Sequence, residues 1–496
     1  MPSLTRRELL AVAGLAVLGL SAPSARATPV DPKALNELEE SLQGSLLRPG
    51  SPDYAALATP RNLRFAATMP EAVVLCAGTE DVAATVAWAN KTQTPFAIRG
   101  GGHNYADASS SRGIVLATRM MNVATVEGTT LRSQAGVRNA DLAKLLPQGG
   151  TGRLLLPGGN CPAVGVVGLT LGGGIGPNAR WAGLTADRLR KVTMVTADGS
   201  VVTAGDTENP DLFWALRGGA GGNYGVVTDL EYELVEVPVN RAVTALITAA
   251  GRDAALAATM AFQKVLADNG RQVSGTLRLG HAGGDVEIRI RMQALATEAE
   301  AHDMLAPLLS VPGVDAALTE RPWWDVYAWY TTAPTPSYSF WDRSLFAEDY
   351  LNEDVVARAI EVVRRFPANG DSERRGAMGL YGWVGEAVTD IAPGDTAYIH
   401  RSAKVLVEMS AGWATPAQSM WPDTPIPPDI RDWEQNLWEV LLPQSTGRSY
   451  QNFPDPLLGD WARSYYGDNL ARLQVVKAAW DPRCLFTHPQ GIPLPG

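Results

Sequence analysis

The chain has 496 residues, of which 46% are hydrophobic and 19% are charged, and its formal net charge is −10. This length favours two domains, the composition is that of a globular protein, and a count of 3 cysteines excludes a small disulfide-stapled fold. The acidic balance argues against a nucleic-acid partner, which would require a basic surface. The 49 glycines, several of them in runs, indicate places where the backbone passes close to another group.

Residues 1–27 have the pattern of an export signal. The pair Arg6-Arg7 precedes an apolar run over 9–20, and Ala25-Arg26-Ala27 fits a cleavage site. The run is too short to cross a bilayer, which takes about 20 apolar residues, and no later stretch is long enough. We therefore predict a secreted protein with no membrane partner, carried by the twin-arginine export machinery. An ordinary secretory signal is the alternative.

Residues 28–237 alternate short β-rich runs with glycine-rich loops, an α+β pattern. The runs predicted as strands are Glu71–Ala77, Phe96–Arg99, Ile114–Ala117 and Val192–Ala197. Thr79 is predicted to cap a helix over Glu80–Asn90, which stops before Pro95. The pair Asp198-Gly199 is predicted to form a hairpin turn.

Residues 238–443 contain nine of the 14 tryptophans and few glycines, which predicts a second, substrate-binding domain. Trp323, Tyr327 and Tyr330 fall on one helical face. Such rings can stack on a sugar or a polycyclic substrate, but core packing is the expected role of any single one. Residues 444–496 form a C-terminal segment whose composition is again rich in glycine, proline and tyrosine.

Two glycine-rich loops in the first domain carry reactive side chains. In the loop Arg99-Gly100-Gly101-Gly102-His103-Asn104, three glycines after a strand let backbone N–H groups converge on an oxyanion such as a pyrophosphate. In the second loop, Cys161 follows Gly158-Gly159-Asn160 and precedes a series of glycines that ends at Gly176. The glycines there allow a flat ligand to lie against the backbone. NAD is not expected, because Pro177 and Asn178 interrupt the helix that a dinucleotide fingerprint requires.

Five separated motifs together resemble one family. They are the Arg99–Asn104 loop, the Gly159–Pro162 loop with its following glycines, and the segments 211–227, 450–455 and 465–482. This set resembles the berberine bridge enzyme-like FAD-linked oxidases of the vanillyl-alcohol oxidase superfamily, from about residue 63 to the C-terminus. The resemblance implies an α+β fold with two domains. The first is a PCMH-type FAD-binding domain, and the substrate domain is built on an antiparallel sheet flanked by helices.

The resemblance also implies FAD with two covalent attachments, from His103 to the flavin 8α-methyl and from Cys161 to C6. Both bonds lie on the benzenoid edge and leave N5 free at the other end. The remaining residues that it implies around the cofactor are Arg99, Gly100, Gly101, Gly102, Asn104, Gly158, Gly165, Gly168, Gly172, Gly173, Gly176, Gly225, Val227 and Asn452. Cys76 and Cys484 have structural explanations, with a disulfide between them as the lesser alternative.

The resemblance assigns the catalytic base to Tyr450. A phenol has a pKa near 10 in water, so the phenolate of Tyr450 has to be stabilised by neighbouring groups. Tyr381 and Asp390 are the candidates for a second acidic group, and His400 is expected to be structural. No metal site is expected, because the remaining histidines lack ligand spacing.

Three functions fit these residues. The first is oxidation of an alcohol on a bulky natural product, such as a polyketide antibiotic or its sugar, to the carbonyl. Hydride would pass to flavin N5, and O2 would be reduced to H2O2. The second is oxidation of a mono- or oligosaccharide at its anomeric carbon. The third is a protein that binds FAD without turnover, which the presence of Tyr450 argues against.

Overall fold

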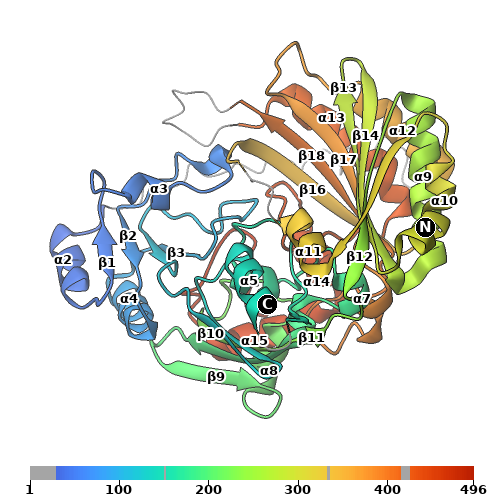
Figure 1. Cartoon of the computed structure of the whole chain (residues 1–496). Coiled ribbons are helices and arrows are strands. Elements are labelled where there is room, and N and C mark those ends of the chain that lie inside the picture. Colours follow the sequence, from blue (N-terminus) through green and yellow to red (C-terminus); the bar gives the residue numbers. More distant parts are fainter. Residues whose placement is uncertain (1–28, 150–151, 332–335, 415–424) are drawn as a thin grey trace, which may run out of the picture.

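The computed structural model describes residues 29–149, 152–331, 336–414 and 425–496. The predicted export signal over 1–27 lies outside these residues. No helix in the described ranges is long and apolar enough to cross a membrane. The chain forms two bodies side by side, the first coloured mainly blue to green and the second mainly yellow to orange (Figure 1).

The first body opens with a four-stranded sheet. Its strands lie in the order β1 (Ser45–Leu47), β2 (Ala72–Leu75), β4 (Ile114–Ala117) and β3 (Phe96–Arg99). Strands β2, β4 and β3 are parallel, and α4 (Thr79–Thr92) connects β2 to β3. The strands predicted over 96–99 and 114–117 are confirmed, while the first predicted strand is shorter. The expected Thr79 cap is wrong: Gly78 is the N-cap and Thr79 is already helical, with two acidic residues in the first turn facing the helix dipole.

A five-stranded antiparallel sheet follows. Its order is β5 (Ala124–Glu127), β6 (Thr130–Gln134), β10 (Val226–Glu233), β8 (Leu189–Val195) and β9 (Val201–Gly205). Gly199 has φ 85° between β8 and β9, which confirms the predicted hairpin turn. The remaining elements of this body are α2 (Pro32–Glu40), α3 (Tyr54–Ala58), α5 (Asn139–Leu145), α6 (Val166–Leu171), α7 (Ala179–Ala182), α8 (Pro210–Ala215) and the pair β7 (Leu154–Leu155) and β11 (Val235–Glu236).

The second body is a seven-stranded antiparallel sheet covered on one face by helices. The strand order is β15 (Asp315–Pro322), β12 (Arg241–Ala250), β14 (Asp285–Ala294), β13 (Val273–Ala282), β17 (Arg375–Gly382), β18 (Val405–Trp413) and β16 (Ser339–Ala347). Helices α9 (Arg252–Asn269), α10 (Glu298–Leu309), α12 (Glu353–Arg364) and α13 (Pro428–Leu441) pack on it around one hydrophobic core. The expected α+β fold with an antiparallel substrate sheet is confirmed.

The two faces of this sheet differ in chemistry because side chains alternate along each strand. Aliphatic residues such as Met378, Leu380 and Val407 join the core beneath the helices. Their neighbours Gly379 and Glu408 point to the other face, which lies against the first body (Figure 1). The sheet therefore presents a mixed polar surface toward the glycine-rich loops.

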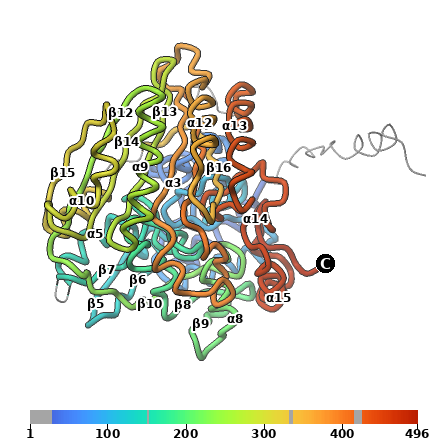
Figure 2. The backbone as a smooth tube through the Cα atoms, turned by 90° about the vertical axis from the view of Figure 1, so that its right-hand side faces the viewer, coloured from blue at the N-terminus to red at the C-terminus, as the bar shows by residue number. Residues whose placement is uncertain are grey.

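Two further segments tie the bodies together. Helix α11 (Trp323–Thr331) buries Trp323 and Tyr327 in the core of the first body, as expected for core residues. The C-terminal helices α14 (Trp461–Tyr466) and α15 (Leu470–Trp480) also return to the first body, where α15 lies beside α8 (Figure 2).

The cysteines at 76, 161 and 484 are free thiols, so Cys76 and Cys484 do not form the disulfide given as the lesser alternative.

Candidate active site

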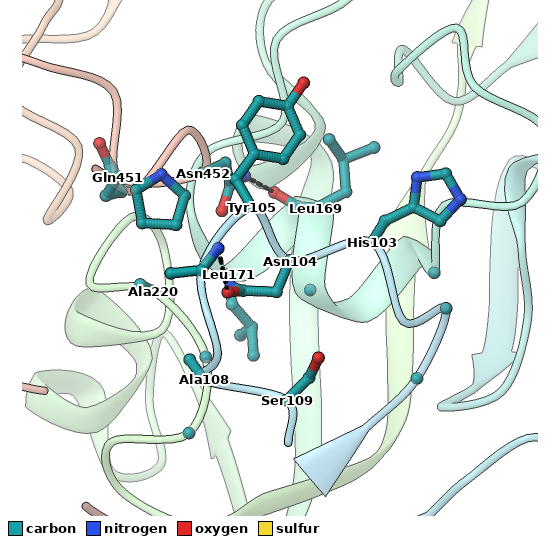
Figure 3. A pocket seen from close by; sticks show the side chains of 18 of the residues that line it. His103, Asn104, Tyr105, Ala108, Ser109, Leu169, Leu171, Ala220, Gln451 and Asn452 are labelled. Carbon is teal, nitrogen blue, oxygen red and sulfur yellow. Dashed lines mark hydrogen bonds between the residues drawn. The ribbon is translucent and has the colours of Figure 1, made fainter. Parts of the chain in front are cut away.

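One large cavity lies between the glycine-rich loops, the polar face of the seven-stranded sheet and the C-terminal segment (Figure 3). Most of the predicted site residues line it, from elements that are far apart in the sequence. They are Gly100, Gly101, Gly102, His103, Asn104, Cys161, Gly165, Gly168, Gly225, Val227, Tyr381, Tyr450 and Asn452.

The loops that carry His103 and Cys161 interlock. A Cβ placed on Gly101 would lie 2.3 Å from the backbone N of Gly165, so the two loops touch only because both positions are glycine. Burial, together with the positive charges of Arg61 and Arg138, lowers the pKa of His103 to about 3, which leaves the imidazole neutral. Burial raises the pKa of the Cys161 thiol, while Arg61 opposes that shift. A neutral imidazole and a thiol thus line the same cavity.

Replacing Gly101 by Ala is expected to separate these loops. The added methyl group meets backbone atoms of the second loop, and overpacking of this kind costs about 1–3 kcal/mol. We expect a lower Tm and a lower ratio of flavin absorbance to protein absorbance. Gly459→Ala is the matched control, because a Cβ there meets no atom within 4 Å. Equal flavin content in the two variants would contradict the interlocking of the loops.

Arg99 does not reach the cavity, which corrects its expected role in cofactor binding. Its guanidinium donates to the carbonyl oxygens of Leu57 and Ala58, each at 2.6 Å, and to that of Ser109 at 2.8 and 2.9 Å. The side chain is buried behind the loop. Arg99 therefore fixes the path of the 100–109 loop, whereas the residues after it form the cavity wall (Figure 3).

Four predicted cofactor glycines also lie outside the cavity wall: Gly158, Gly172, Gly173 and Gly176. A Cβ on Gly176 would lie 1.8 Å from the carbonyl oxygen of Gly158, and one on Gly172 would lie 2.0 Å from Asn452 Oδ1. A Cβ on Gly173 would lie 2.6 Å from the Tyr398 ring. Gly172, Gly173 and Gly176 therefore allow close packing of chain segments, whereas a Cβ on Gly158 would meet only ordinary contacts, the nearest at 3.8 Å.

Gly174, in the same run, supports Tyr450. The Tyr450 hydroxyl accepts hydrogen bonds from the backbone N–H groups of Gly174 and Ile175, both at 3.2 Å, and from Asn452 Nδ2 at 3.0 Å. Gly174 has φ 86°, a conformation that favours glycine. Burial raises the pKa of Tyr450, and these three donors oppose the shift because they stabilise the phenolate. The cavity thus contains hydrogen-bond donors that stabilise the Tyr450 phenolate, which a tyrosine needs if it is to act as a base.

Tyr381 is paired with a carboxyl group that the sequence did not single out. Its hydroxyl donates to Glu408 Oε2 at 2.5 Å, and the Tyr105 hydroxyl also bonds to Glu408. Burial raises the pKa of Glu408, against the opposing effects of Tyr381, Arg278 and Arg61. A sequence pattern that could have identified Glu408 is present in the strand over 405–413. Glu408 and Ser410 alternate there with aliphatic residues, so both polar side chains lie on the face of the sheet toward the site.

Asp390 is wrong as a catalytic candidate. It lies at the end of a short 3-10 segment over 386–390, its side chain is 54% exposed, and it pairs with Arg271 at 2.7 Å outside the cavity. His400 is also outside the cavity wall and is buried, with its ring stacked on Phe346 at 4.1 Å between centroids. Within the described ranges, no group of three or more His, Cys, Asp or Glu residues is arranged to hold a metal ion.

The cavity residues fit FAD. A Cβ on Gly168 would meet no atom within 4 Å, so this glycine faces open space where a ligand ring can approach the backbone. Comparison of the chain with protein families agrees with this fit. The family described as FAD binding domain matches residues 70–205, and the family described as Berberine and berberine like matches residues 449–493. The chain belongs to the berberine bridge enzyme-like FAD-linked oxidases. It is therefore an FAD-dependent oxidoreductase.

Members of this family align with almost the whole chain. Chitooligosaccharide oxidase of Gibberella zeae is 28% identical over 94% of this chain and 96% of its own length. Aclacinomycin-N/aclacinomycin-A oxidase of Streptomyces galilaeus is 28% identical over 86% of each. The solved structure of Physcomitrella patens BBE-like 1 superposes with a TM-score of 0.82 at 25% identity, covering 93% of this chain and 99% of that one.

Proposed function

We propose that this berberine bridge enzyme-like oxidase holds FAD covalently through His103 and Cys161 and oxidises a hydroxyl-bearing carbon of a sugar to the carbonyl level. The observation that carries the proposal is the cavity itself. One part of its wall contains the neutral imidazole and the thiol, and another part contains Tyr450 and Tyr381, whose hydroxyl donates to Glu408 behind the wall. Attachment groups and acid–base groups thus share one cavity.

FAD would supply the two-electron acceptor for this oxidation, with O2 as the final oxidant and H2O2 as its product. The neutral His103 and the Cys161 thiol would hold its benzenoid edge. Gly100 to Gly102 would offer backbone N–H groups to its pyrophosphate. None of these groups has to move a proton during turnover, so they act by binding and orientation.

Two tyrosine side chains, Tyr450 and Tyr381, serve as the acid–base groups. In its phenolate form, stabilised by Gly174, Ile175 and Asn452, Tyr450 accepts the proton of the reacting hydroxyl. Tyr381 is held in place by Glu408 and is oriented to hydrogen-bond the same substrate oxygen or its neighbour. In this division of roles the carboxylate form of Glu408 accepts the Tyr381 hydrogen bond.

The sugar assignment rests on the polar face of the sheet. On that face Tyr381 lines the cavity, and together with Gln451 and Asn452 of the C-terminal segment it offers donors and acceptors to a polyhydroxylated ligand. The printed name of the chitooligosaccharide oxidase relative supports this choice. The runner-up, an alcohol on a glycosylated natural product, is supported by the aclacinomycin oxidase relative.

Peroxide release from two substrate panels tests the proposal. We expect H2O2 with mono- or oligosaccharides, together with a product whose mass is two lower and which hydrolyses to an aldonic acid if the anomeric carbon reacts. Peroxide with polyketide glycosides alone would replace the proposal by the runner-up. A protein that binds FAD and yields no peroxide with either panel would instead be a binding protein.

We also propose that the protein is secreted through the twin-arginine machinery. Replacing Arg6 and Arg7 by Lys should keep the full-length precursor inside the cell, because this route recognises the arginine pair. Fractionation followed by N-terminal sequencing measures the outcome. Undiminished export of the double variant would favour an ordinary secretory signal.

A further inference from the structure

Arg61 reaches the two proposed attachment residues from a segment that the sequence motifs do not include. Its backbone N–H donates to the carbonyl oxygen of Gly102, the residue before His103, at 3.1 Å. Its side chain lines the same cavity as His103 and Cys161. One arginine therefore shares the cavity wall with both groups that are proposed to hold the flavin.

Contacts on two sides fix the position of Arg61. The next residue, Asn62, is fully buried, and its Nδ2 donates to the carbonyl oxygens of Tyr105 at 2.8 Å and Phe340 at 3.1 Å. The first bond reaches the glycine-rich loop, and the second reaches strand β16 of the second body. The Arg61 guanidinium lies 5.1 Å from the Phe340 ring centroid and 5.5 Å from that of Tyr338. Contact of a guanidinium with aromatic rings is attractive, so these rings help to hold it in place.

The positive charge of Arg61 is not neutralised by an ion pair. Its Nε is buried and has no hydrogen-bond partner among the described residues, and no Asp or Glu oxygen in those ranges lies within ion-pair distance of it. By contrast, the buried Arg401 is paired with Asp187 at 2.8 Å. Charges interact more strongly where water is excluded. Arg61 therefore acts on the other groups of the cavity wall.

Cys161 is the group whose reactivity this charge favours. Burial raises the pKa of its thiol, Arg61 lowers that pKa and Glu408 raises it, and of the two charges Arg61 has the larger effect. The thiolate is the nucleophilic form of a cysteine, and a nearby cation increases its population. Arg61 also lowers the pKa of His103, but burial is the main cause of that shift. The charge is therefore expected to matter more for the sulfur than for the imidazole.

We propose that Arg61 promotes the covalent attachment of FAD at Cys161 by placing a fixed positive charge beside the attacking sulfur. In this step the bond between the sulfur and flavin C6 forms, and the thiol proton and the C6 proton are released. Two electrons and two protons convert O2 to H2O2. Arg61 forms and breaks no bond, so it is a positioning residue that acts through Cys161. This inference rests on the proposed function, because it concerns how one of the two proposed attachments forms.

The rate at which each attachment forms tests the inference. Full-length protein expressed under riboflavin limitation is mixed with FAD in air, quenched in acid at set times and digested. Peptide masses then follow attachment at Cys161 and at His103 separately. We expect Arg61→Gln to slow attachment at Cys161 by about 10-fold at neutral pH, because loss of a nearby cation raises the pKa of a thiol by about one unit or more. Attachment at His103 should keep its rate, which shows that the variant folds and binds FAD.

Two further variants separate the charge of Arg61 from its packing. Arg61→Lys keeps a positive charge and should restore most of the rate. A higher pH should bring Arg61→Gln toward the wild-type rate, because the thiolate then forms without a neighbouring cation. Arg375→Gln is the matched control, since the Arg375 guanidinium lies 3.9 Å from the Tyr338 ring centroid but outside the cavity wall. This control should attach FAD at Cys161 as fast as the wild type.

The outcomes separate this inference from the proposed function. Attachment at Cys161 in Arg61→Gln at the wild-type rate overturns the inference and leaves the double attachment standing. Equal slowing at His103 and Cys161, or a deficit that neither Lys nor higher pH repairs, also overturns it, because the role of Arg61 would then be structural. A wild-type protein that forms no bond at Cys161 overturns both. Slower attachment in Arg61→Gln, with no sugar oxidation by the wild type, supports the inference and counts against the sugar oxidase.

Discussion

Tyr450→Phe is expected to lower kcat by about 10²- to 10⁴-fold, the usual contribution of a positioned acid–base group. The substitution removes only the hydroxyl oxygen on which two backbone N–H groups and Asn452 converge. The ring stays packed among Phe346, Tyr398 and Phe453, so the fold and flavin content should be retained. Single-turnover reduction of the flavin at saturating substrate measures the effect on the chemical step.

Tyr232→Phe is the matched control for this variant. Tyr232 is equally buried and its hydroxyl also hydrogen-bonds, to Thr170 at 2.8 Å, but it lies in the core away from the cavity wall. We expect a lower Tm and an unchanged rate of flavin reduction. A Tyr450→Phe enzyme that reduces flavin as fast as this control would remove Tyr450 from the mechanism.

Glu408→Gln is expected to lower kcat/KM by about 10²-fold at neutral pH and to change its pH dependence. The carboxylate form of Glu408 accepts the Tyr381 hydrogen bond. Burial raises the pKa of Glu408, so the carboxylate is protonated as the pH falls through that raised value. The wild-type kcat/KM should therefore fall on the acid side. The Gln variant cannot titrate and should lose this limb of the profile.

Glu434→Gln provides the control for a buried carboxyl that does not face the site. Burial also raises the pKa of Glu434, but its helix, α13, covers the opposite face of the sheet. The acid limb should persist in this variant. If Glu408→Gln kept the same acid limb as the wild type, the limb would belong to another group and the assignment of Glu408 would be wrong.

The residues in the first domain were largely predictable because their signals are local. A strand followed by three glycines and His103 identifies its loop without any long-range information, and β3 ends at Arg99 as expected. The same local reasoning predicted ligand contact for too many of the glycines. Gly172 and Gly176 stand in a run typical of ligand contact, yet they serve chain packing against Asn452 and Gly158.

The substrate side was harder to predict because it depends on strand register. Tyr381 and Glu408 are 27 residues apart and meet only because β17 and β18 are adjacent strands. Asp390 was proposed from its nearness to Tyr381 in sequence, but the chain leaves β17 at Gly382 and turns outward before it reaches Asp390. Alternation of polar and aliphatic residues in each strand predicts which face a residue occupies, and not which residue lies beside it.

The absorbance and peptide mass of the acid-precipitated protein test the central claim most directly. If His103 and Cys161 both hold the flavin, the pellet stays yellow after washing. Proteolysis should then give a cross-linked species that contains both peptides and one FAD. The variants His103→Ala and Cys161→Ala should each retain one attachment and a coloured pellet, and the double variant should retain neither. A colourless wild-type pellet, with FAD recovered in the supernatant, would contradict the account.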